Sequence, residues 1–117
     1  MSKFLVLYLM PAEGLAEWMK IDPEIRKSEE EKMKADWDAW ASAHSSSLLE
    51  TAGAGKTKRI TPEGVQDVAN NIMLYSMVEA ESTEAAAQLF EGHPHLKIPG
   101  GTIEVMPTNI LPGMEKK

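Results

Sequence analysis

The pattern of apolar residues predicts a sheet of four strands. Residues 4–10 are apolar without interruption, and residues 72–80 carry large apolar side chains at both odd and even positions. Because successive side chains of a strand point to opposite faces, both segments should be buried on both sides of the sheet. Two further strands are expected over residues 48–61, with a glycine-rich interruption, and over residues 102–106. A turn at residues 61–64 and a loop up to residue 71 should follow the strand over residues 48–61.

Helical periodicity predicts one long helix over residues 28–47. Ser28 and Glu31 have the spacing of a capping box, which satisfies free backbone N–H groups at a helix start. The apolar stripe of this helix consists of Met33, Trp37, Trp40, Ala41, His44 and Leu48. A short helix over residues 14–20 precedes it, and Asp22-Pro23 predicts a turn between the two.

The second main helix should cover residues 83–91. Ser82 is the expected N-cap, and Gly92 stands where helices commonly end. The resulting order, βαββαβ, predicts an α+β protein of the ferredoxin-like type, with an antiparallel sheet. Right-handed crossovers place both helices on one face of that sheet. The first and third strands are apolar on the other face as well, so we expect a homodimer with sheets stacked face to face.

Composition narrows the classes of function. The 117 residues fit one domain, residues 1–117, with a flexible tail from about residue 108 that includes residues 115–117. A net charge of −6 argues against a nucleic-acid partner, since like charges repel. The chain has no Cys, so thiolate chemistry and disulfides are excluded. No apolar segment is long enough to span a membrane, and we expect a cytoplasmic protein without a cofactor.

Two motifs suggest ligand sites but lack essential parts. The segment 53–57, Gly-Ala-Gly-Lys-Thr, resembles a phosphate loop, yet Glu50 stands where that motif needs Gly and a strand follows where it needs a helix. A strand bent at glycine explains the segment better. His93-Pro94-His95 offers two imidazoles, and a zinc-type site would need a third ligand such as His44 or Glu104. Since this spacing matches no known metal motif, we expect no metal site.

The histidines are the main candidates for chemistry. His44 lies on the apolar stripe, where it is either a core residue or a neutral base facing a cavity. We expect His93 and His44 as catalytic candidates, and His95, Tyr8, Trp40 and Glu104 as ligand-binding candidates. Three functions stay open: small-molecule binding, a lyase or isomerase reaction with His93 or His44 as general base, and a non-catalytic assembly module.

The C-terminal third resembles a known family. A Ser-capped helix that runs into EGHPHL (residues 91–96) and then GGTIEVMP (residues 100–107) is similar to the YCII-related family, in its branch close to the DGPF-domain proteins. The resemblance implies a dimeric α/β barrel. It also implies a cleft near the dimer interface, where lyases of the dehydrochlorinase type use a His and an Asp. His93 stands in the place of that Asp, and residues 1–43 contain no counterpart of the His.

Overall fold

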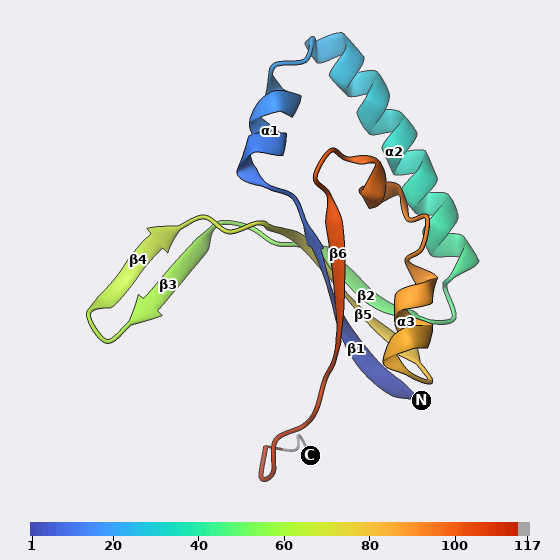
Figure 1. Ribbon diagram of the computed structural model, residues 1–117, viewed down its shortest axis with the longest axis vertical. Coiled ribbons are helices and arrows are strands. Elements are labelled where there is room, and N and C mark those ends of the chain that lie inside the picture. Colours follow the sequence, from blue (N-terminus) through green and yellow to red (C-terminus); the bar gives the residue numbers. More distant parts are fainter. Residues whose placement is uncertain (115–117) are drawn as a thin grey trace.

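The computed structural model describes residues 1–114 and confirms the ferredoxin-like architecture (Figure 1). Four antiparallel strands form the main sheet in the order β2-β5-β1-β6. Their bounds are Ser2–Leu9 for β1, Leu48–Gly53 for β2, Ile72–Ala80 for β5 and Thr102–Pro107 for β6. The helices are α1 (Ala12–Met19), α2 (Pro23–Ala43), α3 (Thr83–Leu89) and the short 3-10 helix η1 (Pro94–Lys97). Across residues 1–114, no helix combines the length and apolarity needed to cross a membrane.

The core lies between the sheet and the helices. Its buried members come from both strands and helices: Phe4, Val6, Tyr8, Trp40, Val78, Ala80, Ala86 and Phe90. Burial of one large apolar side chain contributes about 1.5–3 kcal/mol, so this face stabilises the fold strongly. The opposite face of β1 carries Leu5, Leu7 and Leu9, which are only half-buried. The strands are therefore apolar on both sides, but in this chain only one side is covered.

Helix α2 begins earlier than its sequence pattern predicts. Asp22 is the N-cap, and its side chain accepts a hydrogen bond from the backbone N–H of Glu24 at 2.9 Å. Pro23 occupies the first helical position, where a missing N–H costs nothing. The predicted capping box at Ser28 is therefore wrong, because Ser28 lies inside the helix. Helix α2 also ends sooner than expected, at Ala43.

The segment from residue 54 to residue 70 differs most from the prediction. A second, two-stranded sheet is formed by β3 (Thr57–Thr61) and β4 (Gly64–Val68), where a strand end and a loop were expected. The predicted turn at residues 61–64 is present, and Gly64 has a φ of +129° that favours glycine. We call residues 54–70 the arm, because Figure 1 shows this hairpin projecting from the body of the molecule. The prediction of an interrupted strand over residues 48–61 is confirmed for residues 48–53 and 57–61, but it is wrong in joining them, because the two halves belong to different sheets.

Helix α3 follows the prediction closely. Ser82 caps it by accepting a hydrogen bond from the N–H of Ala85 at 3.0 Å. Gly92 follows with a φ of +74°, and the chain then turns into η1. At the C-terminus, the backbone N–H and the hydroxyl of Thr108 both donate to the carbonyl oxygen of Lys3. Of the predicted flexible tail, residues 115–117 lie outside the described residues.

Candidate functional site

The loop after α3 places His93 inside a cluster of aromatic rings. Only 1% of His93 is exposed. Its ring centroid lies 4.3 Å from Trp37, 4.5 Å from Trp40, 5.4 Å from Tyr8 and 5.8 Å from Phe90. We call these five residues the His93 cluster. It joins β1, α2 and α3. His93, a catalytic candidate from the sequence, therefore lies at the centre of the core.

Hydrogen bonding fixes the proton on the His93 ring. Nδ1 accepts a hydrogen bond from the backbone N–H of His95 at 3.0 Å, so the neutral ring carries its proton on Nε2. Nε2 has no hydrogen-bond partner among the described residues. The ring meets Trp37 and Trp40 edge-on, at interplanar angles of 85° and 67°. Contacts of an N–H group with ring faces are weak, so they compensate only part of the lost hydration.

The same surroundings keep His93 uncharged at neutral pH. Burial, with smaller contributions from charge on His95 and His44, lowers the pKa of His93 to about 4. The ring is thus a hydrogen-bond donor through Nε2, while its lone pair on Nδ1 is already engaged. To act as a base, His93 would have to give up its bond with the His95 N–H.

His95 holds the loop against the first strand. It is 2% exposed, and its Nε2–H donates to the carbonyl oxygen of Leu9 at 2.8 Å. A Cβ atom on Gly101 would lie 2.6 Å from the His95 carbonyl oxygen, so the chain passes too closely here for any side chain. These contacts give His95 a structural role.

His44 lies at the end of α2, where it is half-buried and stacks on Trp40 at 4.6 Å between centroids. Its Nδ1–H donates to the Trp40 carbonyl oxygen at 2.9 Å, which leaves the lone pair on Nε2. The Trp40 indole N–H donates to the carbonyl oxygen of Leu89 at 3.0 Å, and so ties α2 to α3. His44 can therefore accept a proton or hydrogen bond at Nε2, whereas His93 donates one there.

Tyr8 begins a row of hydroxyl groups across the sheet. Its hydroxyl lies 2.7 Å from that of Ser76, which in turn lies 2.7 Å from the hydroxyl of Thr51. Burial raises the pKa of Tyr8, although the Ser76 hydrogen bond partly opposes this. Tyr8 therefore stays protonated and links β1, β5 and β2.

Glu104 lies apart from the other candidates. It pairs with Leu7 across β6 and β1, so it is on the sheet face away from the helices, and it is exposed. His93, His95, His44, Tyr8 and Trp40 are thus brought together, and Glu104 is not. Within residues 1–114, no group of three or more His, Asp or Glu side chains is placed to hold a metal ion.

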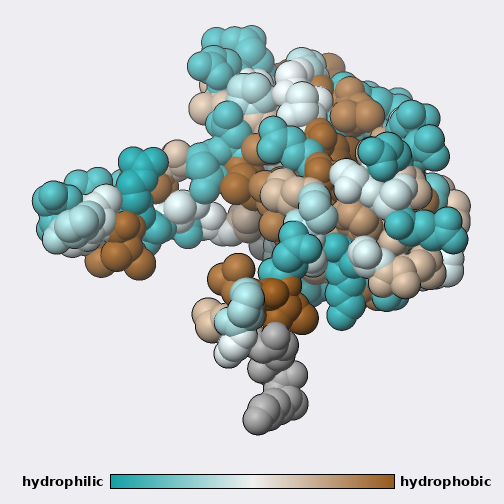
Figure 2. Space-filling model, turned by 60° about the horizontal axis from the view of Figure 1, so that its bottom comes forward, coloured by the Kyte–Doolittle hydropathy of each residue, from teal (hydrophilic) through white to brown (hydrophobic). Residues whose placement is uncertain are grey.

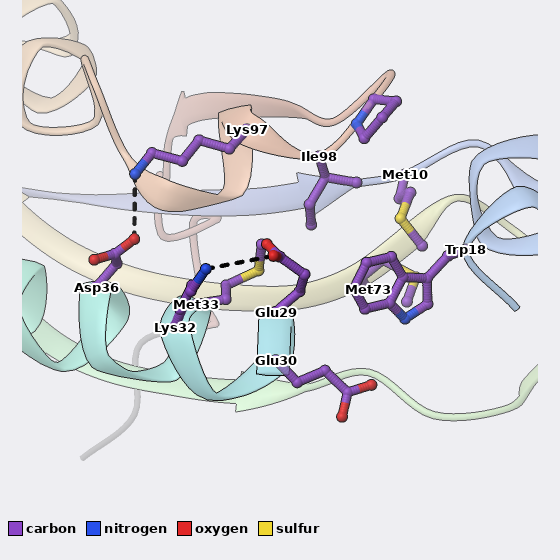
Figure 3. Close-up of a pocket in the computed structure, with 11 residues that line it drawn as sticks. Met10, Trp18, Glu29, Glu30, Lys32, Met33, Asp36, Met73, Lys97 and Ile98 are labelled. Atoms are coloured by element: carbon purple, nitrogen blue, oxygen red, sulfur yellow. Dashed lines mark hydrogen bonds and ion pairs between the residues drawn. The ribbon is translucent and has the colours of Figure 1, made fainter. Parts of the chain in front are cut away.

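Beside the His93 cluster lies a cavity of about 450 Å³ (Figure 3). We call it the helix–sheet pocket. Its apolar wall consists of Met10, Trp18, Met33, Met73, Ile98 and Pro99, and its charged lining consists of Glu29, Glu30, Lys32, Asp36 and Lys97. Trp18, Met10 and Met73 gather at one end, and the ion pair of Lys97 with Asp36, 3.2 Å long, lies at the other (Figure 3).

The pocket and the His93 cluster are neighbours along two elements. Met10 follows Tyr8 by two residues, just past the end of β1, and Met33 precedes Trp37 by one turn of α2. None of the candidate residues chosen from the sequence lines this pocket. Two signals pointed toward it: Trp18, unusually large for a connecting segment, and Met33 at the start of the apolar stripe.

Comparison with known proteins supports the fold. No protein-family model and no curated protein sequence matches the chain. The structure is similar to that of 5-chloro-2-hydroxyhydroquinone dehydrochlorinase (TftG) from Burkholderia phenoliruptrix AC1100, solved in complex with 2,5-dihydroxybenzoquinone. The TM-score is 0.54 at 12% sequence identity, and the match covers 98% of this chain and 100% of that chain. At this identity the likeness shows the fold alone, an α+β arrangement of helices on an antiparallel four-stranded sheet.

Proposed function

We propose that this chain is a small-molecule-binding protein of the YCII-related type, and that its ligand occupies the helix–sheet pocket. The observation that carries the proposal is the pocket itself, whose volume lies in the range of small-molecule sites. Its wall is mainly apolar, and three Met side chains with one Trp offer soft, adaptable contacts to a flat ring.

The polar end of the pocket defines the ligand further. Lys97 and Lys32 are available to oxygen atoms of a ligand, and the ion pairs that they make are largely exposed. Exposed ion pairs contribute little to stability, so they can rearrange at small cost. We therefore propose a planar aromatic or quinone-like ligand whose oxygen-bearing group points toward Lys97. The similar dehydrochlorinase was solved with a ligand of this class.

A homodimer is part of the proposal. The uncovered sheet face carries half-buried Leu5, Leu7 and Met77, which a second copy would cover if the two sheets packed face to face. Sedimentation equilibrium tests this directly, and a monomer at all accessible concentrations would refute it.

A lyase or isomerase reaction is the second candidate, because His44 presents a free lone pair at Nε2 beside Trp40. His44 does not line the helix–sheet pocket, so the reacting compound would bind at the end of α2 instead. His44→Ala should then abolish turnover of the bound compound while leaving its binding intact. If no compound is turned over by the native chain, binding alone remains. If no compound raises the melting temperature, the non-catalytic assembly module is favoured.

Calorimetric titration with 2,5-dihydroxybenzoquinone and with hydroxybenzoates tests the pocket. Met33→Trp should fill it and weaken binding at least tenfold. Met19→Trp is the matched control, because Met19 is exposed and does not line the pocket, and its affinity should change less than twofold. Equal affinities in the two variants would refute the assignment.

The role of Lys97 has its own test. Lys97→Met should weaken binding of carboxylated rings several-fold and affect uncharged analogues much less. Lys34→Met is the control, because Lys34 also forms an exposed ion pair on α2, with Asp38, but does not line the pocket. If both variants bind carboxylates like the native chain, the polar end has been misassigned.

A further inference from the structure

The arm is a hairpin that its own chain supports only at the base, where the backbone N–H of Ala54 donates to the carbonyl oxygen of Met73 at 2.9 Å. Its strands pack on each other, and among the described residues neither forms a substantial contact with another element. Its cross-strand apolar pair is exposed, Ile60 by 79% and Val65 by 62%. A lone two-stranded hairpin is at best marginally stable in water. The arm therefore needs a surface that covers Ile60 and Val65.

The position of the arm indicates where that surface is. In Figure 1 the arm extends from the main sheet on the side away from α2 and α3, which is the side of the uncovered sheet face. Figure 2 shows the arm standing clear of the body, with hydrophobic atoms on it. A second copy placed against the uncovered face would thus lie next to the arm.

Charge favours a second copy over an unrelated acidic or basic partner. The arm carries three basic and two acidic side chains, so the rest of the chain has a net charge of −7. The uncovered face contributes Glu50, Glu79 and Glu104 together with Lys3, which share the side of Leu7 and Met77 by their register, so acidic residues outnumber basic ones there. On the side of Ile60 and Val65, Lys58 is paired with Asp67 at 2.6 Å. The match with the uncovered face is therefore mainly apolar, and the net positive charge of the whole arm adds to it.

We propose that the arm clasps a second copy of this chain, with Ile60 and Val65 packed on the uncovered sheet face or its edge. By two-fold symmetry each copy gives one arm and receives one. This inference rests on the homodimer proposed above, and it adds a specific contact to it. The arm would then order on assembly and contribute to the strength of the dimer.

Cross-linking tests the contact. The chain has no Cys, so Val65→Cys provides a single attachment point for a benzophenone maleimide. Protein labelled with ¹⁴N and protein labelled with ¹⁵N are mixed, irradiated and digested. We expect mixed-isotope cross-links from position 65 to peptides of β1, β5 or β6. Cross-links within one copy alone, or to no peptide of the main sheet, would overturn the proposal.

A matched pair of substitutions measures how much the arm contributes to the stability of the dimer. Val65 and Gln66 are adjacent on β4 and face opposite sides of the arm. Val65→Glu should raise the dissociation constant of the dimer at least tenfold, and Gln66→Glu less than twofold. Circular dichroism verifies that both variants are folded. A native dimer that both variants weaken equally, or that neither weakens, would refute the clasp alone, whereas a native monomer would refute the homodimer and the clasp together.

Discussion

Protonation of His93 should destabilise this protein in mildly acidic solution. The pKa of His93 is lowered to about 4 in the folded chain, while an unperturbed His has a pKa near 6.5. In the unfolded chain, His93 therefore binds a proton below about pH 6.5, whereas in the folded chain it binds one only below about pH 4. The stability contributed by the neutral ring is present above pH 6.5 and is lost as the pH falls from 6.5 to 4.

The size of the effect follows from the difference in pKa. One pKa unit corresponds to about 1.4 kcal/mol, so the free energy of unfolding should fall by about 2–3 kcal/mol between pH 7.5 and pH 4.5 through His93 alone. The total free energy of unfolding of a small domain is about 5–15 kcal/mol, so such a loss is easily measured.

His93→Asn isolates this contribution. An Asn side-chain oxygen can accept the backbone N–H two residues on, so the bond from His95 is kept while the titrating ring is removed. Urea unfolding of both proteins at pH 7.5, 6.5, 5.5 and 4.5 gives the difference in stability at each pH. Carboxylates titrate in both proteins and cancel. We expect the native chain to be the more stable at pH 7.5, by about 1–3 kcal/mol from ring packing, with the difference shrinking or reversing by pH 4.5. Parallel pH profiles would show that His93 is not held neutral by its surroundings.

Two further predictions concern the backbone. Asp22→Ala should lower the free energy of unfolding by about 1 kcal/mol through loss of the α2 cap, whereas Ser28→Ala should change it by less than about 0.5 kcal/mol. If Asp22→Ala and Ser28→Ala lowered the free energy of unfolding equally, the capping box at Ser28 would be supported instead. Gly101→Ala should lower the melting temperature by several degrees, because its Cβ would meet the carbonyl oxygen of His95, whereas Gly55→Ala has open space and should change it little. A tolerated Gly101→Ala would mean that this close approach relaxes freely.

The main sheet could be predicted from the sequence because the alternation of apolar side chains in a strand depends only on neighbouring residues. The two-faced runs of β1 and β5 and the Ser82 cap of α3 each depend on a few neighbouring residues. The start of α2 was mispredicted, since Pro23 can either end one helix or begin the next, and packing decides between them. The arm was missed because Val65 and its neighbours are exposed and carry little apolar signal.

The candidate site was predictable only in part. Tyr8, Trp40 and His93 converge because each belongs to the apolar stripe or strand that faces the core. The pocket depends instead on the gap between the first half of α2 and the sheet, a distance that no local pattern encodes. Glu104 was placed with the histidines by its position in the sequence, yet the alternation of β6 sends it to the other face.

The two halves of helix α2 contribute to different parts of the structure. Its first half supplies Glu29 and Lys32 to the pocket, and its second half supplies Trp37 and Trp40 to the core. Substitutions in the first half can therefore alter the lining of the pocket without disturbing the packing that holds the fold. Such a helix lets the chemistry of the pocket change between related chains while their architecture, and their ability to fold, stays the same.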